Sequence, residues 1–375
     1  MTQIAHRPIG ELVVNLDRRR VPVKASDRRG GPYPYYGASG VVDHVDDYLF
    51  EGLHLLVAED GENLRSRNTP VAFLADGRFW VNNHAHVLQG NSENDTRYLS
   101  YALEAADISG YVTGSAQPKL SQAALAAIEV PAPPLDVQRA IAATLGALDD
   151  KIESNRQLAE RASAVIDASA SQLRARTSTE VLPLADLVEF NRLSVKPHST
   201  DALRYIDIAS VSPGQIDSVQ ELTWDEAPSR ARRGVSDGDV IYSTVRPGNR
   251  AFALIVDPTP GSVASTGFAV MSPSVRLGSS MLTSVVGAPE FAEYLESVAH
   301  GSAYPAVGIQ AMGSYPVVVP KEAVVAEQFE ADTMPLRRRV AQARAESERL
   351  AALRDTLLPE LLSGRMRVPT EGVAA

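Results

Sequence analysis

Residues 136–176 have the sequence DVQRAIAATLGALDDKIESNRQLAERASAVIDASASQLRAR, the longest uninterrupted periodic segment of the chain. Alternating steps of four and three residues reach mostly apolar positions, with Asn155 and Ser169 as polar interruptions. The positions are Ile141, Leu145, Leu148, Ile152, Asn155, Ala159, Ala162, Ile166, Ser169 and Leu173. A 3.5-residue apolar period is typical of a helix that packs along a partner helix. The segment therefore predicts one long helix with a coiled-coil seam.

The same steps recur later in the chain, with Phe329 in the place of Ile141, a shift of 188 residues (329 − 141). The positions are Phe329, Thr333, Leu336, Val340, Ala343, Ser347, Leu350, Arg354, Leu357 and Leu361. One helix cannot bury its own seam, so we expect the two helices to pack on each other. Antiparallel packing is expected because the chain must return to the start of an equivalent half. The predicted pairing residues are Ile141, Leu145, Leu148, Ile152, Ile166, Leu173, Phe329, Leu336, Val340, Leu350, Leu357 and Leu361.

Two reservations remain at the level of sequence. Pro335 lies inside the second seam, where a proline would kink the helix or mark its true beginning. Periods of 3.5 and 3.6 residues are also hard to separate over short runs, so two unrelated surface helices of ordinary globular domains stay open as an alternative.

Other landmarks repeat in the same order around the two helices. They are Arg7–Val13 and Leu182–Val188, the triplets Gly114-Ser115-Ala116 and Gly301-Ser302-Ala303, short runs closing at Pro131 and Pro320, and Gln138 and Gln328. This order predicts a tandem duplication. The expected domains are residues 1–134 and 181–325, with spacer helices at 135–180 and 326–368 and a disordered tail at 369–375. The polar tract 174–180 is expected to act as a linker.

The two bodies read as mixed, strand-rich structure. Short strands are expected at 53–57, 71–74, 79–81, 203–208, 240–244, 251–256 and 268–271, and a helix at 289–299. Tyr33–Gly40 is rich in Gly, Pro and Tyr and is expected to form an aromatic loop. The predicted fold class is α+β: two α/β domains in a tandem pseudo-repeat, separated by two long antiparallel coiled-coil-like helices.

Composition limits the classes of function. The chain has 375 residues, no cysteine, and 46 acidic against 36 basic residues, so disulfides and thiolate metal sites are excluded. A net negative charge opposes DNA, and DNA binding would have to rest on local basic clusters. No apolar run is long enough to span a membrane, and Met1–His6 lacks the layout of a signal peptide. We expect a cytoplasmic protein.

Several motifs resemble the DNA specificity subunit of type I restriction-modification systems. They are Tyr36–Gly40, Leu55–Asn63, Asn82–His86, Pro133–Gln138, Leu148–Glu153 and Leu357–Gly364. The resemblance implies two target recognition domains, each reading one half of an asymmetric bipartite site in double-stranded DNA. It also implies that the helices dock two methyltransferase subunits, and that restriction subunits join this core. Catalysis, together with S-adenosylmethionine, magnesium and ATP, is then expected on those partners, with no catalytic residue, cofactor or metal in this chain.

Clustered cations that could hold DNA phosphates, and donors on loops that could contact bases, mark the candidate DNA-binding residues. In the first body these are Arg18, Arg19, Arg20, Lys24, Tyr35, Tyr36, Ser39, Arg65, Arg67 and Lys119. In the second body they are Arg230, Arg232, Arg233, Ser243, Thr244, Arg246, Asn249, Arg250 and Tyr304. Arg246 and Asn249 rank highest, because their segment offers donors with little apolar content to bury. Solvated charge runs and structural ion pairs are the alternative explanation.

Two alternative functions are a magnesium-dependent nuclease and a coiled-coil scaffold. His84 and His86, with Glu59, Asp60 and Glu62, could form the metal site of a magnesium-dependent nuclease. No Walker-type phosphate loop, Gly-x-Ser-x-Gly elbow, or Asn-Pro-Pro-Tyr or Asp-Pro-Pro-Tyr tetrapeptide occurs. A coiled-coil scaffold that never contacts DNA would share the helices, but would not need arginine and asparagine on loops of two divergent bodies.

Overall fold

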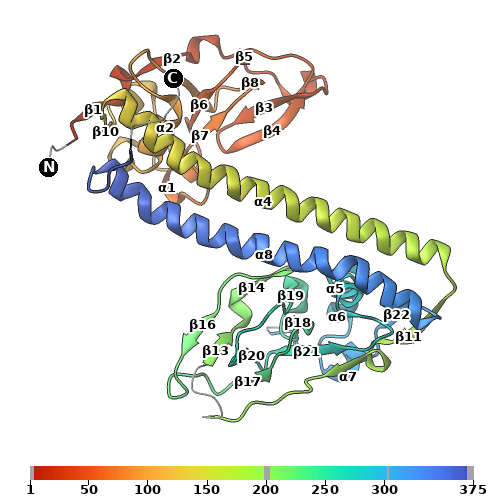
Figure 1. Cartoon of the computed structure of the whole chain (residues 1–375). Coiled ribbons are helices and arrows are strands. Elements are labelled where there is room, and N and C mark those ends of the chain that lie inside the picture. Colours follow the sequence, from red (N-terminus) through yellow and green to blue (C-terminus); the bar gives the residue numbers. More distant parts are fainter. Residues whose placement is uncertain (1–3, 198–202, 302–303, 370–375) are drawn as a thin grey trace. The chain divides into compact units, whose positions relative to one another are not determined.

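The structure is a computed structural model that describes residues 4–197, 203–301 and 304–369 (Figure 1). Two long helices are its largest elements: α4 (Leu135–Arg176) and α8 (Ala323–Leu362). The structure starts α4 at the predicted residue and α8 three residues early, and it ends both a few residues early. The expected linker at 174–180 is wrong, because α4 continues to Arg176 and strand β11 (Thr179–Pro183) begins almost at once. Of the predicted tail, residues 370–375 lie outside the described residues.

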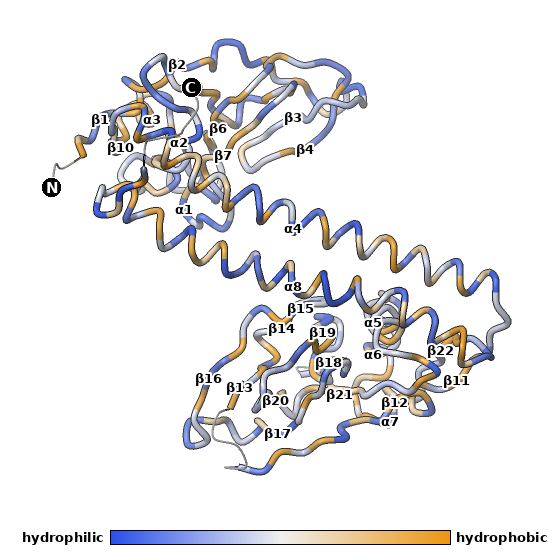
Figure 2. Tube along the Cα trace, in the orientation of Figure 1, coloured by the Kyte–Doolittle hydropathy of each residue, from blue (hydrophilic) through white to orange (hydrophobic). Residues whose placement is uncertain are grey.

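Both predicted seams are the least exposed stripes of their helices. All of their positions are buried or half-buried, and Leu145, Ile166 and Ala343 are fully buried. Figure 2 shows apolar and polar residues alternating along both helices. The two polar interruptions differ: Asn155 is buried, whereas Ser169 is half-buried. The 3.5-residue pattern therefore identified the packed stripe of each helix.

The chain forms two compact units, residues 1–153 with 348–375, and residues 154–347. Each long helix contributes to both units, so these units differ from the predicted domain boundaries. In the first unit, Ile141 shares a core with Leu361, and Asp149 forms an ion pair of 2.9 Å with Arg354. In the second unit, Ile166 shares a core with Phe329 and Leu336, and Asn155 donates to Glu346 at 2.9 Å. The order of these contacts is antiparallel, as predicted.

Pro335 lies within α8 and does not begin it, since the helix starts twelve residues earlier at Ala323. Proline lacks the N–H that an interior helical residue donates to the carbonyl four residues earlier. The seam nevertheless continues on both sides, with Thr333 buried and Leu336 half-buried. The pairing of the helices thus tolerates the missing hydrogen bond.

The part of the first unit that precedes α4 is called here the first domain. One sheet has the order β2 (Val13–Asn15), β9 (Ala85–Gly90), β6 (His54–Ala58) and β7 (Ala72–Ala75). The other sheet has the order β4 (Gly40–Val45), β3 (Tyr33–Gly37), β8 (Arg78–Val81) and β5 (Phe50–Glu51). Strands β1 (His6–Pro8) and β10 (Glu129–Pro131) form a ribbon. The helices of the first domain are η1 (Ile9–Glu11), η2 (Asp17–Arg19), η3 (Ala25–Asp27), α1 (Asn63–Ser66), α2 (Thr96–Glu104), η4 (Ser109–Tyr111) and α3 (Gln122–Ala126).

The segment between α4 and α8 is called here the second domain. One sheet has the order β12 (Val188–Phe190), β21 (Phe268–Pro273), β18 (Val240–Ser243) and β19 (Phe252–Leu254). The other has the order β16 (Gln220–Leu222), β13 (Leu203–Ile206), β20 (Ser262–Ser265) and β17 (Ala231–Gly234). Strand β11 pairs with β22 (Pro316–Pro320), and β14 (Val211–Ser212) with β15 (Gln215–Ile216). The helices of the second domain are η5 (Leu184–Asp186), η6 (Ile208–Ser210), η7 (Pro247–Asn249), α5 (Ser279–Gly287), α6 (Pro289–Ser297) and α7 (Ile309–Gly313).

The two domains have the same connectivity. In each, the first four-stranded sheet is antiparallel and the second contains one parallel pair, β3 with β8 or β13 with β20. Helix α2 follows β9 as α5 follows β21, and α3 and α7 both lead into the ribbon that precedes a long helix. The predicted α+β fold with a tandem pseudo-repeat is therefore confirmed, even though the repeated landmarks cover little of either body.

One local prediction fails. The Tyr33–Gly40 segment is not a loop: Tyr33–Gly37 is strand β3, and Gly40 begins its antiparallel partner β4. The aromatic residues favour a strand more strongly than Pro34 and the glycines oppose it. Only Ala38 and Ser39 form the turn between the two strands.

No helix among the described residues is both long and apolar enough to cross a lipid bilayer.

Candidate nucleic-acid interface

Each domain carries a short arginine-containing loop between equivalent strands. In the first domain residues 61–67 lie between β6 and β7, and in the second domain residues 245–250 lie between β18 and β19. These segments are called the arginine loops. Each one contains a short helix that ends at an arginine in the left-handed conformation, Arg67 (φ 47°) or Arg250 (φ 54°). Candidate DNA-binding residues were predicted in both segments independently. The fold shows that the two segments occupy equivalent positions in their domains.

The two Gly-Ser-Ala loops, residues 113–119 and 300–306, lie beside the arginine loops. Lys119 forms isolated bridges with Thr113 and Asp60, and Ala306 forms the matching bridges with His300 and Val245. Gly114 and Gly301 have φ values of 85° and 100°, which suit glycine. A Cβ on Gly114 would lie 2.2 Å from the carbonyl oxygen of Gln117, so this turn also requires a residue without a side chain. Ser302 and Ala303 lie outside the described residues.

The second domain presents three groups suited to contact nucleic acid. The guanidinium of Arg246 lies 4.7 Å from the centroid of the Tyr304 ring, and Tyr304 is 69% exposed. The amide of Arg246 donates to Pro305 at 2.7 Å, which ties the two loops together. Asn249 is exposed, and its side-chain amide has no hydrogen-bond partner among the described residues. A forked donor, an amide and an aromatic ring are groups that contact base edges and stack on bases.

The matching surface of the first domain is built differently. The guanidinium of Arg65 donates to the carbonyl oxygens of Gly114 and Ser115, so it fixes the Gly-Ser-Ala loop while remaining exposed. Lys119 is 55% exposed and lies 3.3 Å from a carboxylate oxygen of Glu59. Both cations reach the surface at these loops. Arg65 therefore combines a structural contact with a position at the candidate interface.

Arg67 and Arg250 make hydrogen bonds within their own domains. Their guanidinium groups donate to backbone carbonyls at the carboxyl ends of α2 and α5, those of Glu104 and Ala106 in one case and Gly287 in the other. Both side chains are only half-exposed. Part of each guanidinium group is thus engaged within the fold, and direct DNA contact by these two arginines stays a prediction.

Three further candidate residues have little exposed surface for DNA, since Tyr35 and Ser243 are buried and Arg20 is half-buried. Tyr35 is 1% exposed, and its hydroxyl lies 3.0 Å from the Val23 nitrogen, which donates to it. Ser243 is fully buried and donates to the carbonyl of Val245. Arg20 donates to Glu59 and to the carbonyl of Ala85, both at 2.7 Å. An arginine that neutralises carboxylates inside the fold is not available to a phosphate.

The rest of the first basic run remains at the surface. Arg18 and Lys24 are exposed, and no partner is recorded for either side chain within the described part of the chain. Arg19 donates to the carbonyl of Leu49 and lies over the Phe50 ring. Ser39 is exposed at the turn between β3 and β4. Tyr36 is half-buried with its ring edge-on to Phe79 at 5.6 Å, and burial raises the pKa of its hydroxyl.

The second basic patch is partly occupied by the fold. Arg230 is exposed and lies 3.4 Å from Asp207. Arg232 and Arg233 are half-buried in β17, and Arg232 donates to the carbonyl of Ala231. Thr244 is half-buried and donates to the carbonyl of Gly267 at 2.8 Å. Of these four residues, only Arg230 offers an exposed charge.

Of the two histidines considered for a nuclease, His86 belongs to a buried hydrogen-bond network, whereas His84 is exposed. His86 is 1% exposed, with Nδ1 lying 2.6 Å from Asp17 and Nε2 lying 2.9 Å from the carbonyl of Leu120. His84 instead faces Asp60 at 2.8 Å. Neither ring nitrogen of His86 is free for a metal, and no cluster of three metal-ligating side chains occurs in the described ranges. Sequence reasoning missed the Asp17–His86 pair, because the two residues are 69 positions apart.

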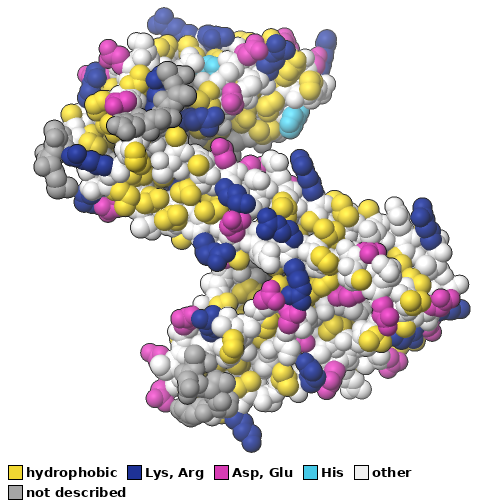
Figure 3. Space-filling view, in the orientation of Figure 1, with side chains coloured by type: hydrophobic (Ala, Val, Ile, Leu, Met, Phe, Trp, Pro, Cys, Tyr) yellow, Lys and Arg dark blue, Asp and Glu magenta, His cyan; other side chains and the backbone are white. Residues whose placement is uncertain are grey.

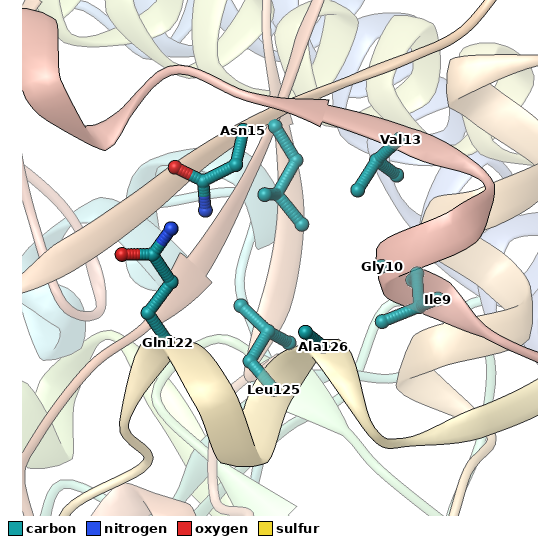
Figure 4. A pocket seen from close by; sticks show the side chains of 8 residues that line it. Ile9, Gly10, Val13, Asn15, Gln122, Leu125 and Ala126 are labelled. Atoms are coloured by element: carbon teal, nitrogen blue, oxygen red, sulfur yellow. The ribbon is translucent and has the colours of Figure 1, made fainter.

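A small pocket of about 180 Å³ lies in the first domain between η1, β2, β9 and α3 (Figure 4). Its lining is mainly apolar, with the amides of Asn15 and Gln122, and it contains no charged side chain that could hold a phosphate. On the face drawn in Figure 3, Lys and Arg side chains are interspersed with Asp and Glu. The arginine and Gly-Ser-Ala loops therefore remain the strongest candidate interface.

Parts of the chain are similar to known proteins. Residues 4–163 match the model of the type I restriction modification DNA specificity domain. A Haemophilus influenzae protein named as a type I restriction enzyme specificity subunit is 37% identical over 147 residues, which are 39% of this chain and 38% of that protein. A Mycoplasma pneumoniae protein named as a type I specificity subunit is 30% identical over 143 residues, 36% of this chain and 58% of that protein. The matches thus span less than two thirds of either relative.

A crystal structure of the S subunit of a type I restriction-modification system from M. genitalium shares the fold. The TM-score is 0.67 at 17% sequence identity, with 96% of each chain covered. The match to the specificity-domain model covers the first domain and most of α4, and the fold similarity extends to the second domain. The first part of the chain is therefore similar to type I restriction-modification DNA specificity domains, and the chain has the fold of a type I S subunit.

Proposed function

We propose that this chain is the non-catalytic subunit that selects the DNA sequence in a type I restriction-modification complex. Each domain contacts one half of an asymmetric bipartite site through its arginine loop and its Gly-Ser-Ala loop. One observation carries the proposal: the same fold occurs twice and places two loops of different composition at equivalent positions. Two domains with the same fold but different hydrogen-bond donors on their loops are suited to recognise two half-sites of different sequence.

The charge of the chain fits a complex better than an isolated DNA-binding protein. Acidic residues exceed basic ones by ten, so long-range attraction to DNA is weak without partners that add positive charge. We propose two methyltransferase subunits as the first partners and restriction subunits as later ones, within the cytoplasm. S-adenosylmethionine, magnesium and ATP would be bound by those chains.

We also infer that α4 and α8 set the distance between the half-sites. Each helix passes from one compact unit to the other without interruption. Seven residues added to both helices would keep the seam in register and add about 10 Å. At about 3.4 Å per base pair, the spacer should grow by roughly three base pairs while both half-sites stay the same.

The insertion is placed beside Asn155 in α4 and beside Glu346 in α8, where the helices contact each other. A control with seven residues inserted in α4 alone shifts one seam against the other and should destabilise the pair. Genome-wide mapping of methylated adenines in cells carrying the whole operon would report both half-sites and the spacer. An altered half-site with an unchanged spacer would contradict the role of the helices.

The strongest single variant is Arg246→Ala. If Arg246 contacts a base, the substitution should cost about 1–3 kcal/mol of discrimination and relax one position in a single half-site. Tyr304→Phe is the matched control, because it keeps the ring beneath the guanidinium and removes only an exposed hydroxyl. Weakening that is uniform across all sequences would reassign Arg246 to a phosphate contact.

A scaffold without DNA readout remains the alternative to be tested. Sequence-specific binding by the assembled complex should fall steeply as salt rises, because phosphate contacts release counterions. A scaffold would show no sequence preference at any salt concentration. Magnesium-dependent nicking by the isolated chain would support the nuclease alternative. Both ring nitrogens of His86, however, already contact groups within the fold.

A further inference from the structure

Arg67 and Arg250, two of the three arginines with a left-handed backbone among the described residues, have equivalent positions in domains whose loops share little sequence. Arg67 is the residue after helix α1, and Arg250 is the residue after helix η7. A left-handed conformation costs a residue with a side chain about 1–2 kcal/mol, whereas glycine adopts it freely. Both domains nevertheless have arginine there. The side chain must therefore make contacts that offset the strain.

Those contacts are alike in the two domains. The Arg67 guanidinium donates to the carbonyls of Glu104 and Ala106, and it lies 3.3 Å from the Glu104 carboxylate. The Arg250 guanidinium donates to the carbonyl of Gly287, the last residue of α5. The last carbonyls of a helix have no partner within it, and a cation there also opposes the negative end of the helix dipole. Each arginine thus fastens an arginine loop to the helix that follows the first sheet.

Additional contacts hold the same loops at other points. The Glu104 carboxylate accepts from the amides of Val71 and Ala72, at the start of β7. In the second domain the Tyr242 hydroxyl donates to the carbonyl of Pro247 at 3.0 Å. A Cβ on Gly248 would lie 1.9 Å from a carboxylate oxygen of Glu296, so α6 packs closely on η7. The loops are therefore held in place before any DNA is bound.

We propose that Arg67 and Arg250 are positioning residues for DNA recognition, each of which fixes the arginine loop of its own domain without touching DNA. This inference depends on the proposed function. Arg65 is two residues before Arg67, and Arg246 and Asn249 are within four residues of Arg250. A loop released from its helix would present these donors in several orientations, and the preference for one base would fall.

The test uses glycine at the two positions. Arg67→Gly and Arg250→Gly are compatible with the left-handed backbone and remove the whole side chain with its guanidinium group. Arg67→Lys and Arg250→Lys keep the charge but lose the forked donor, so they should give smaller effects of the same kind. Each variant is assembled with its methyltransferase subunits. Binding is measured on the specific duplex identified by methylation mapping and on duplexes with single base-pair changes in either half-site.

The expected result is a loss of discrimination in one half-site only. Arg67→Gly should lower the preference for the correct base about tenfold in the half-site of the first domain, and Arg250→Gly should do so in the other. The dependence of binding on salt should stay the same, because no phosphate contact is removed. Faster amide exchange at 113–119 in free Arg67→Gly, where Lys119 donates to Thr113, would show the loosened loop directly.

Three results would overturn the inference. Unchanged discrimination in both half-sites would mean that the loops need no such support. Equal losses in both half-sites would assign the arginines to general stability, and a salt slope reduced by about one would assign them to phosphate contact. A wild-type complex with no sequence preference would instead refute the proposed function, and this inference with it.

Discussion

The equivalent sheets of the two domains are buried with different chemistry. Strand β9 of the first domain carries His86, while the matching position of β21 in the second domain is Ala269; their cross-strand neighbours are Val57 and Tyr242. His86 belongs to a network of charged side chains, whereas Tyr242 stacks on Phe252 with ring centroids 5.9 Å apart. The fold is thus compatible with either a polar or an aromatic interior at this place.

The polar network connects distant parts of the first domain. Asp17, from η2, contacts His86 and also accepts from the Val87 amide at 2.8 Å. The two ring nitrogens of His86 face the Asp17 carboxylate and the Leu120 carbonyl. Arg20 and Glu59 complete the network. Because Glu59 also contacts Lys119, the network reaches the Gly-Ser-Ala loop.

The aromatic interior of the second domain also supports a surface loop. Phe291 of α6 lies edge-on to Tyr242 at 5.1 Å and to Tyr315 at 4.8 Å. The Tyr242 hydroxyl supports η7, and burial raises its pKa to about 12. Each domain therefore uses its buried residues to hold a surface loop, the first through a polar network and the second through an aromatic cluster.

The largest expected effect of a single substitution is that of Asp17→Ala. It removes the buried carboxylate that contacts His86, the Val87 amide and Arg20, which should cost about 3–5 kcal/mol of unfolding free energy. Denaturant unfolding of the full chain measures the loss, and hydrogen exchange should place it in the first domain. Arg18→Ala is the control, because that exposed side chain has no recorded partner and should change stability by about 0.5 kcal/mol or less. Equal effects of both variants would show that the network does not stabilise the domain.

The charge on Asp17 should make this contribution depend on pH. Burial alone would raise the pKa of Asp17, but hydrogen bonds from His86 and the Val87 amide hold it below its ordinary value of 3.8. A lowered pKa means that the stabilisation is present above the ordinary value and is lost as pH falls through the folded value. The difference in unfolding free energy between wild type and Asp17→Asn should therefore shrink in acid. If the difference in unfolding free energy stays constant down to the lowest pH at which the chain is folded, the predicted pH dependence is wrong.

A smaller effect is expected for Tyr242→Phe in the second domain. The substitution keeps the stacked ring and removes one hydrogen bond, which is worth about 0.5–1.5 kcal/mol. Because the lost partner is Pro247, base discrimination should weaken in the half-site of the second domain alone. Binding to duplexes with single base changes would measure this. A loss in the half-site of the first domain would contradict the assignment of loops to domains.

The smallest change in stability is expected for Asn155→Leu in the seam. Asn155 is 3% exposed and donates to Glu346, so leucine exchanges a hydrogen bond for apolar burial in a helix pair. Buried polar residues in coiled coils specify register at a cost in stability. We expect an unfolding free energy within about 1 kcal/mol of wild type, together with a broader range of tolerated spacers in methylation mapping. A unique spacer would show that the remaining contacts fix the register without Asn155.

The sequence by itself determined the parts of this protein that depend on local periodicity. The 3.5-residue seam identified α4, α8 and their packed faces, and the order of landmarks identified the duplication. Arg246, Asn249 and Tyr304 were chosen from their residue type and setting, and the structure brings them together at the surface. Such features are visible locally, because helix faces and turn residues are specified by neighbours a few positions apart.

Only the tertiary structure decided which arginines remain available at the surface. Arg20, Arg67 and Arg250 have the same local signature as Arg65 and Arg246, but their partners lie up to 65 residues away and become neighbours only through sheet pairing. Tyr35 likewise became buried because the segment before β3 covers it: Arg28 lies over its ring and Val23 contacts its hydroxyl. A charged or aromatic side chain is compatible with either environment, and long-range contacts, which a single sequence does not display, choose between them.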